Sequence, residues 1–351
     1  MHAHGMESYA RTRYIDMFVL FFLSLCLSYC YAFPRVTLLN RRNLPSSNAQ
    51  VHFNITSNAQ DDTRPIIDEV SYVDFDLELP TSLFKKPNFC NDCVCGLGRK
   101  TRIIGGNITN VFDYPWIVSM SEKGKFYCAG TVITRKHILT AAHCVRGFDI
   151  KTIKLILMDN DRPFIGSSAI IRYINSATIH ENFHSYSFNN DIAIIEMNEP
   201  VSLNDIVRTA CLPEDKTIDY TGALATVIGW GRTGETKPVS DELRKVNLPI
   251  LSKEECDQAG YAKNRISENM FCAGYIEGIG GQDACYGDSG GPLHVKGIYG
   301  QLEVIGIVSW GRGCGRPNFP GVFTKLTNYI AWIRDHIDEE CICPPPHQQS
   351  K

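Results

Sequence analysis

The sequence lacks a strong excess of charge of either sign. Its 351 residues carry 35 basic and 38 acidic side chains, for a formal net charge of −3. A nucleic-acid-binding surface or a strongly charged substrate field usually shows as a large imbalance, so neither is expected. The sequence also lacks a clear internal repeat. Its 44% content of hydrophobic residues is that of an ordinary globular protein.

Long apolar runs are absent except for one segment near the N-terminus. This segment, residues 17–32, reads MFVLFFLSLCLSYCYA and follows Arg11 and Arg13. It is short for a membrane span, which needs about 20 apolar residues. Basic residues before the run and a small residue at its end, Ala32, are typical of a signal peptide. We therefore predict that residues 1–32 are removed and the protein is secreted, with no membrane contact afterwards; a retained anchor is the alternative.

Cysteine is absent from residues 33–89 and frequent after them. Of the fourteen cysteines, Cys26 and Cys30 lie in the predicted signal peptide, which leaves an even number. An even number in an exported chain favours a disulfide framework. Zinc is the rival interpretation, since Cys90-x-x-Cys93 and Cys341-x-Cys343 are close pairs. A second C-x-x-C at finger spacing is missing, so no metal and no cofactor are expected.

Residues 33–102 are predicted to be a propeptide that is mostly extended and acidic. Their basic start gives way to a stretch with seven acidic residues and Arg64 as its one base: Asp61, Asp62, Asp68, Glu69, Asp74, Asp76 and Glu78. The strip SYVDFDLEL alternates, which fits an edge strand or an extended acidic arm. Two N-x-T sequons, at Asn54 and Asn107, predict glycosylation of an exported chain.

The sequence texture changes at Ile103 to short β-branched runs with turn residues between them. These runs are WIVSM, GTVITRKHILT, IKLILM, DIAIIEM, ATVIGW, LEVIGIVSW and GVFTKL. Many short strands separated by Gly, Asn and Pro indicate an all-β barrel or sandwich. In residues 326–340, Ile330, Ile333 and Ile337 recur at helical spacing, which predicts a terminal helix on the barrel. The prolines of the tail, residues 338–351, forbid further helix.

Three short motifs carry residues suited to nucleophilic catalysis. CYGDSGGP, residues 285–292, surrounds Ser289 with glycines, so the N–H groups of Gly287 and Ser289 can point at one spot. LTAAHC, residues 139–144, supplies His143 as a base, and NNDIAIIEM, residues 189–197, supplies Asp191 as an orienting acid before a strand. Each motif taken alone also fits a turn or an ordinary buried side chain.

Together with IIGG at residues 103–106, these motifs resemble the chymotrypsin/trypsin family of serine endopeptidases. The order His143, Asp191, Ser289 is that of this family. The resemblance covers about residues 103–337. It implies two six-stranded antiparallel β-barrels, a catalytic cleft between them and a C-terminal helix, with His143, Asp191 and Ser289 as catalytic residues and Gly287 and Ser289 forming the oxyanion hole.

Zymogen activation is a further implication of the resemblance. Cleavage after Arg102 would free the α-amino group of Ile103 to pair with Asp288, next to the nucleophile. A buried charge needs a partner, and Gly105-Gly106 gives the new terminus freedom to swing inward. The stretch RKTR also fits a furin-type R-x-x-R site, so the activating protease is expected to be furin-like, trypsin-like or the enzyme itself.

The resemblance also gives expectations for specificity. Asp283 corresponds to the acid at the base of the primary pocket in trypsin-like members, so cleavage after Arg or Lys is expected. Ser309, Trp310 and Gly311 match the strand that binds substrate backbone, and Gly311 and Gly321 match the pocket walls. Three further residues refine this picture: Ala284 favours Arg over Lys, Phe188 favours a small residue in the second subsite, and Pro320 argues against sodium activation. Calcium binding is doubtful, because the segment LMDNDRPFIGSSAI lacks the acid that calcium would need at its far end, near Ile170.

Disulfide pairing is likewise implied by the resemblance. It pairs Cys128 with Cys144, Cys256 with Cys272 and Cys285 with Cys314, and it makes Cys211 the tether of the propeptide. A further family bridge is absent, since Ala225 and Val295 stand at its two positions. Six cysteines stay without an assigned connectivity: Cys90, Cys93, Cys95, Cys211, Cys341 and Cys343.

Two alternatives compete with the serine protease hypothesis. HENFH, residues 180–184, fits the H-E-x-x-H zinc motif, which needs both imidazoles on one helical face with Glu181 as base. Its surroundings are rich in Ser and Asn, which disfavours a helix. A catalytically weak homologue acting as a binding cofactor is the other alternative, although all three triad positions and Asp283 are filled. As partners we expect protein substrates with Arg or Lys before the cut, an activating protease and a serpin-type inhibitor.

Overall fold

The computed structural model describes residues 89–99, 108–162, 165–204, 206–214, 217–276 and 283–346. These residues all lie in one compact unit, Thr81–Lys351. Several features predicted from the sequence lie outside the described residues. They are the signal peptide, most of the propeptide, the activation residues Arg102 and Ile103, and the sequons at Asn54 and Asn107. No helix among the described residues combines the length and apolar composition that a membrane crossing requires.

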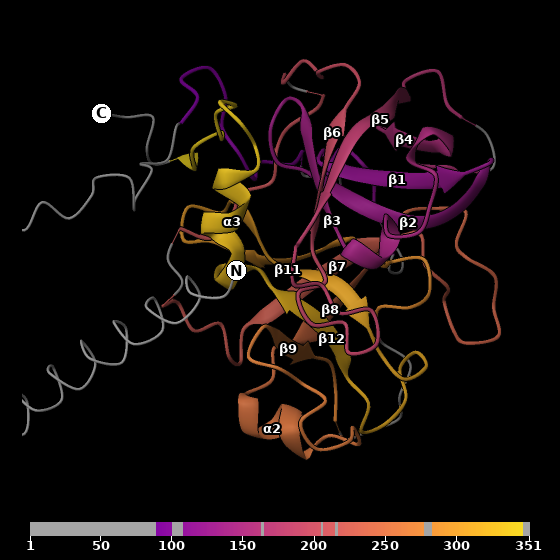
Figure 1. The fold of residues 1–351 in the computed structure, drawn as a ribbon, viewed down its shortest axis with the longest axis vertical. Coiled ribbons are helices and arrows are strands. Elements are labelled where there is room, and N and C mark those ends of the chain that lie inside the picture. Colours follow the sequence, from indigo (N-terminus) through magenta and orange to yellow (C-terminus); the bar gives the residue numbers. More distant parts are fainter. Residues whose placement is uncertain are drawn as a thin grey trace, which may run out of the picture. The chain divides into compact units, whose positions relative to one another are not determined.

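The described residues form twelve strands in two antiparallel sheets. Figure 1 shows how these sheets are arranged. The first sheet is a closed barrel of order β1-β2-β3-β6-β5-β4. Its strands are β1 (Ile117–Glu122), β2 (Lys125–Val132), β3 (His137–Thr140), β4 (Ile153–Leu157), β5 (Ile170–Ile179) and β6 (Ala193–Met197). Alternate residues of a strand point to opposite faces, which explains how the barrel interior is filled. In β4, Ile153, Leu155 and Leu157 are buried, while Lys154 and Ile156 between them are half-buried.

The second sheet has six strands in the order β8-β7-β10-β11-β12-β9. Its strands are β7 (Leu224–Gly229), β8 (Arg244–Pro249), β9 (Met270–Ala273), β10 (Pro292–Lys296), β11 (Leu302–Trp310) and β12 (Gly321–Lys325). An isolated bridge joins Ile250, directly after β8, to Ala273 at the end of β9. The two outer strands therefore approach each other at one end, and the sheet curls toward a second barrel. The all-β architecture predicted from the sequence is confirmed.

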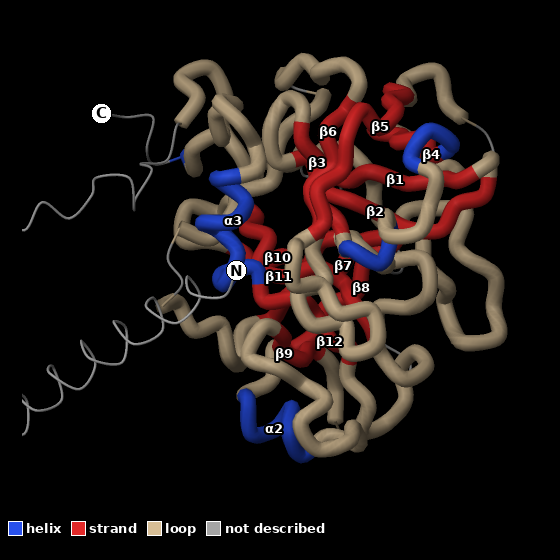
Figure 2. The backbone as a smooth tube through the Cα atoms, in the orientation of Figure 1, coloured by secondary structure: helices blue, strands red, loops and turns tan. Residues whose placement is uncertain are grey.

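Helices are short and peripheral, as Figure 2 shows. Helix α2 (Lys253–Gln258) begins with a capping box formed by Ser252 and Glu255. This helix was not predicted from the sequence. The C-terminal helix is shorter than the predicted 326–340: a 3₁₀ turn, Leu326–Tyr329, leads into α3 (Ile330–Asp335). It ends where His336 leaves helical geometry, because the tail then turns back into two disulfides.

A buried hydrogen bond between Trp116 and His294 helps to link the barrel to the second sheet. The Trp116 Nε1–H, just before β1, donates to Nε2 of His294 in β10 at 2.7 Å. The other ring nitrogen of His294 lies 3.1 Å from the Thr226 carbonyl oxygen in β7. This pattern requires the neutral imidazole with its proton on Nδ1. Burial in turn lowers the pKa of His294 to about 4.

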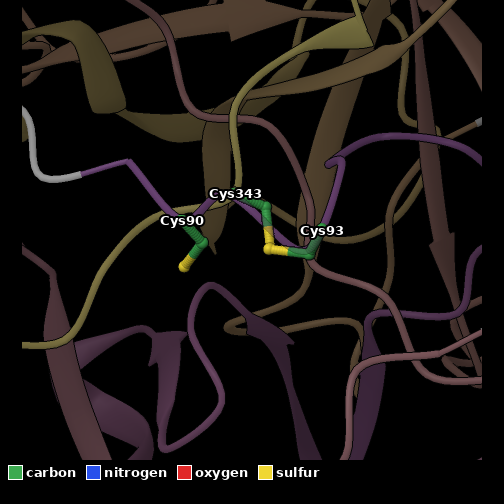
Figure 3. Close-up of side chains that lie close together, drawn as sticks. All are labelled: Cys90, Cys93 and Cys343. Atoms are coloured by element: carbon green, nitrogen blue, oxygen red, sulfur yellow. A yellow bond between two sulfur atoms is a disulfide. The ribbon is translucent and has the colours of Figure 1, made fainter. Parts of the chain in front are cut away.

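All twelve cysteines of the described residues form disulfides. Three bridges join the pairs implied by the family resemblance, Cys128–Cys144, Cys256–Cys272 and Cys285–Cys314. The other three attach the segment 89–99, which precedes the predicted activation site: Cys90–Cys341, Cys93–Cys343 and Cys95–Cys211. Figure 3 shows the Cys93–Cys343 bridge with Cys90 beside it. Residues 89–99 are thus bound to the tail twice and to the domain once.

Backbone contacts fix the same segment against the domain. Cys90 N–H donates to the Ile342 carbonyl at 3.0 Å, and Leu302 N–H donates to the Gly96 carbonyl at 2.8 Å. Gly98 is required by close approach, because a Cβ there would lie 1.8 Å from the Asp113 carbonyl oxygen. The segment therefore packs as part of the domain body.

The neutral state of His294 makes stability depend on pH. An unfolded histidine titrates near pH 6.5, whereas the pKa of native His294 is about 4. Between these values only the unfolded chain binds the proton, so the free energy of unfolding should fall as pH falls, by about 2 to 3 kcal/mol. Urea unfolding at pH 7 and pH 4.5 of wild type and His294→Gln checks this. Equal losses in both proteins would contradict it.

The segment 89–99 should stay attached after the chain is cut at Arg102, even without its bridge to the domain. In a Cys95→Ser, Cys211→Ala variant, the bridges Cys90–Cys341 and Cys93–Cys343 remain. Non-reducing electrophoresis after the cut should show one band, and two bands after reduction. Release of the N-terminal fragment without reductant would contradict the observed pairing.

Candidate active site

Asp191 is fully buried where the barrel faces the second sheet. Its Oδ1 accepts the His143 backbone N–H at 2.9 Å, and its Oδ2 lies 2.7 Å from the His143 Nδ1. The Ser309 hydroxyl donates to Oδ2 at 2.5 Å, and the Thr324 hydroxyl donates to the Asp191 carbonyl at 2.8 Å. A buried carboxylate needs such partners. The acid therefore holds one tautomer of the imidazole, with the proton on Nδ1.

His143 lies in a 3₁₀ turn, Ala142–Cys144, that directly follows β3. Ala141 and Ala142 are fully buried, and the Cys128–Cys144 bridge anchors the turn to β2. The side chain of His143 keeps 24% of its surface exposed, against 0% for Asp191. With Nδ1 directed at the acid, Nε2 is the nitrogen left to act as a base.

His143 and Ser289 line one cleft of about 440 Å³. Ser289 lies in the loop before β10, in which Gly287 has φ +105°, a conformation that favours glycine. Among the described residues, the N–H groups of Gly287 and Ser289 donate to no protein acceptor. Two unpartnered N–H donors beside a serine hydroxyl can stabilise a developing oxyanion.

The same cleft ends at the carboxyl group of Asp283. Its Oδ2 accepts the Gly315 N–H at 3.0 Å, whereas its Oδ1 is buried and has no hydrogen-bond partner among the described residues. Burial raises the pKa of Asp283 to about 7. A Cβ on Gly321 would come within 3.0 Å of Oδ1, so that glycine keeps the pocket open. The pocket can take a long cationic side chain, whose donors would fill the unmet acceptor.

Asp288 is buried beside Ser289 but points away from the cleft. Its Oδ1 accepts the Gly231 N–H at 2.8 Å, and its Oδ2 accepts the Cys285 N–H at 2.9 Å. Burial raises the pKa of Asp288 to about 6, and no cation contacts it among the described residues. It lines a second cavity of about 170 Å³ together with Gly229 and Gly231.

The other predicted substrate-binding residues also line the cleft, and one of them, Ser309, also contacts Asp191. Ser309, Trp310, Gly311 and Gly321 all lie along it. The Ser309 hydroxyl donates to Asp191, so this side chain holds the acid in place. A role for Thr324 was not predicted from the sequence, because a threonine near the end of a short apolar strand offers little signal. Phe188 lies edge-on to the His143 ring, 5.5 Å between centroids.

The HENFH stretch forms turns, and no helix of the described residues includes it. The ring of His180 packs 5.2 Å from the Trp332 ring, while His184 contacts Ser187. Glu181 accepts the Trp332 indole N–H at 3.1 Å. The helical face that the zinc motif requires is therefore missing.

Two groups of potential metal-binding side chains occur in the described part of the chain: Cys90, Cys93 and Cys343, and Cys128, His143 and Cys144. All five of these cysteines are disulfide-bonded. A disulfide sulfur is not a thiolate, so neither group offers a zinc site.

Comparison with known proteins agrees with this geometry. The sequence model of the trypsin family matches residues 103–333. The chain is 39% identical over 242 residues to a trypsin of Xenopus laevis, which covers 67% of this chain and 91% of that protein. It is 36% identical over 265 residues to the proclotting enzyme of Tachypleus tridentatus, covering 70% and 69% respectively. It is 34% identical over 247 residues to the clotting factor G beta subunit of the same animal, covering 67% and 79%.

Replacing Asp191 by asparagine tests the tautomer argument. An amide at this position can donate to Nδ1, so Nε2 would carry the proton and could not act as base. The expected loss in kcat on an arginine-ended peptide is about 10⁴-fold, the size typical of this substitution in a Ser-His-Asp triad. Ser309→Ala removes one donor only and should cost about tenfold. Near-full activity of Asp191→Asn would contradict the assignment.

Proposed function

Because the chain belongs to the trypsin family of serine endopeptidases, we propose that it is a secreted zymogen that cuts peptide bonds after arginine, and then lysine, once it has been cleaved after Arg102. The observation that carries this proposal is the shared cleft, which holds His143 and Ser289 at one end and the unpaired carboxyl oxygen of Asp283 at the other.

Catalysis begins when His143 takes the Ser289 proton as the hydroxyl oxygen attacks the substrate carbonyl. The resulting oxyanion accepts hydrogen bonds from the N–H groups of Gly287 and Ser289. His143 then gives its proton to the leaving amine, and an acyl-enzyme remains on Ser289. Water, deprotonated by the same imidazole, releases the acid product. Asp191 keeps Nδ1 protonated throughout and stabilises the imidazolium.

Substrate choice rests on Asp283. In the empty pocket its charged form is disfavoured, as its raised pKa of about 7 reflects. An arginine guanidinium supplies a planar pair of donors and a charge to this acid. Ala284 adds no hydroxyl that would help to hold a lysine ammonium, so arginine is preferred.

Activation rests on Asp288 and on the cavity next to it. The carboxylate has two backbone donors but no cation among the described residues, and the cavity of about 170 Å³ is lined by Gly229 and Gly231. The α-amino group that a cut after Arg102 creates at Ile103 would complete the charge balance of Asp288. Its arrival would hold Gly287 in place beside the nucleophile.

The wider organisation follows from the same proposal. Residues 1–32 act as the signal peptide, 33–102 as the propeptide and light chain, 103–337 as the protease domain and 338–351 as the tail. A light chain held by three disulfides, together with relatives named as clotting enzymes, supports a place in an extracellular proteolytic cascade. Its partners would be protein substrates, an activating protease and a serpin-type inhibitor.

Asp283→Ser tests the assignment of specificity. With the acid gone, kcat/KM on an arginine-ended peptide should fall by about 10³-fold or more, because the guanidinium then lacks a partner. A phenylalanine-ended peptide should not lose activity. Ala284→Ser is the matched control, since its added hydroxyl should raise lysine relative to arginine cleavage. An arginine preference that survives in Asp283→Ser would contradict the pocket.

Activity should appear only after the cut at Arg102. The purified full chain is treated with trypsin, the trypsin is blocked selectively, and hydrolysis of the arginine peptide is followed. Arg102→Gln should stay inactive, and Ser289→Ala should stay inactive although it is cut. A fully active uncut chain would contradict the zymogen proposal.

A further inference from the structure

A row of three aromatic rings beside the cleft carries an arginine at each end. The rings of Trp310 and Tyr261 have centroids 5.0 Å apart, and those of Tyr261 and Phe319 are 5.4 Å apart. The guanidinium carbon of Arg265 lies 4.3 Å from the Trp310 ring centroid, and that of Arg312 lies 4.8 Å from Phe319. We call this set the arginine-capped row. Stacking holds both cations in defined places.

The row lies on the same side of the cleft as Phe188, because Phe188, Tyr261 and Trp310 pack against one hydrophobic cluster. Arg265 and Trp310 line the cleft together with Ser289. The Nη1 group of Arg265 donates at 2.5 Å to the carbonyl of Ser187, next to Phe188. Arg265 and Phe188 therefore lie close together along the cleft. Because the family resemblance places Phe188 beside the second subsite, Arg265 would face substrate residues farther from the scissile bond.

Neither arginine of the row has a carboxylate partner in the described part of the chain. By contrast, Arg316 in the same loop as Arg312 is paired with Glu235. A guanidinium has five N–H donors, and the described residues accept one from Arg265. Two positioned cations with spare donors favour an anion on whatever chain crosses them.

The predicted activation sequence of this protein is basic, whereas the two arginines of the row favour an acidic chain. Before the cut after Arg102 come Thr101, Lys100 and Arg99, so the third and fourth positions are both basic. A chain bound in the cleft through Arg102 would bring these two cations toward Arg265. Like charges brought together lower affinity.

We propose that Arg265, assisted by Arg312, selects substrates with an acidic side chain at the third or fourth position before the scissile arginine, and that it rejects the protein's own activation site. The inference rests on the proposed arginine-directed cleavage. It makes the mature enzyme a poor activator of its own zymogen, so that a separate protease with a different preference must start it. The substrates of this enzyme are then a class distinct from its own precursor.

Three peptides that differ only in charge at these positions test the proposal. They end in Glu-Glu-Thr-Arg, Gln-Gln-Thr-Arg and Arg-Lys-Thr-Arg before a reporter group, and the enzyme is the cut, disulfide-intact chain with the activator removed. We expect kcat/KM to fall in that order, by about three- to fivefold per step at low salt, and the spread to shrink at high salt.

Variants assign the effect to the row. Arg265→Gln should bring the three peptides to within about twofold of one another, and Arg312→Gln should reduce the spread in part. Arg265→Lys should keep part of the difference between the peptides, since lysine retains the positive charge but lacks the planar set of guanidinium donors. Arg172→Gln is the matched control, because Arg172 donates to the carbonyls of Glu199 and Pro200 in the barrel and does not line the cleft. It should leave the spread unchanged.

Cleavage of the uncut Ser289→Ala chain gives a second readout, because that chain presents the natural activation site but cannot cut. Mature Arg265→Gln should cut it faster than mature wild type does. Equal rates, or a wild-type preference for the basic peptide, would overturn the inference. If every variant except Ser289→Ala cleaves the neutral peptide, the proposed arginine-directed cleavage holds whatever the outcome for the charged peptides. If no variant cleaves the neutral peptide, the proposed function itself is wrong.

Discussion

The buried carboxylate of Asp191 is the interaction on which the rest of the site depends. The residue leads into β6 of the barrel, yet two of its partners, Ser309 and Thr324, come from strands of the second sheet. The third partner, His143, follows β3. A charge without exposed surface is costly unless each oxygen is bonded, so the acid requires both sheets to be in place. The direction of the imidazole is thereby set by the packing of one sheet against the other.

Two further buried acids are incompletely paired, and this incompleteness has a chemical use. The pKa of Asp283 is raised to about 7 and that of Asp288 to about 6, in both cases mainly by burial. An acid held in this way gains most from an arriving cation. For Asp283 that cation would be the substrate's arginine, and for Asp288 the new terminus at Ile103. In the proposed function, recognition and activation would thus rest on the same physical principle, namely the pairing of a buried acid with an arriving cation.

The three disulfides of residues 89–99 give the light chain a structural role as well as a covalent link. Its backbone pairs with the tail and with β11, and Gly98 allows it to approach Asp113 closely. Because Arg99 lies at the end of this fixed segment, the activation sequence begins next to the domain. Under the proposal made above, the charge of the arginine-capped row would decide whether the mature enzyme can cut that sequence.

Much of the fold could be predicted from residue patterns. The short β-branched runs, IKLILM among them, predicted strands, and this run lies in β4. The family motifs placed His143, Asp191 and Ser289 in order, and the structure brings His143 and Ser289 to one cleft and Asp191 to His143. The predicted terminal helix was too long, because periodicity at Ile337 continued past the point where the tail's disulfides turn the chain.

Local order and spacing in the sequence were enough to identify the family, the catalytic residue types and an even set of cysteines. Three-dimensional packing was needed to show that Cys90 pairs with Cys341 and Cys93 with Cys343, that Ser309 donates to Asp191, and that Arg265 stacks on Trp310. Each of these contacts joins residues far apart in the chain. Their pairing is set by how the two sheets and the tail pack, and no local pattern encodes that.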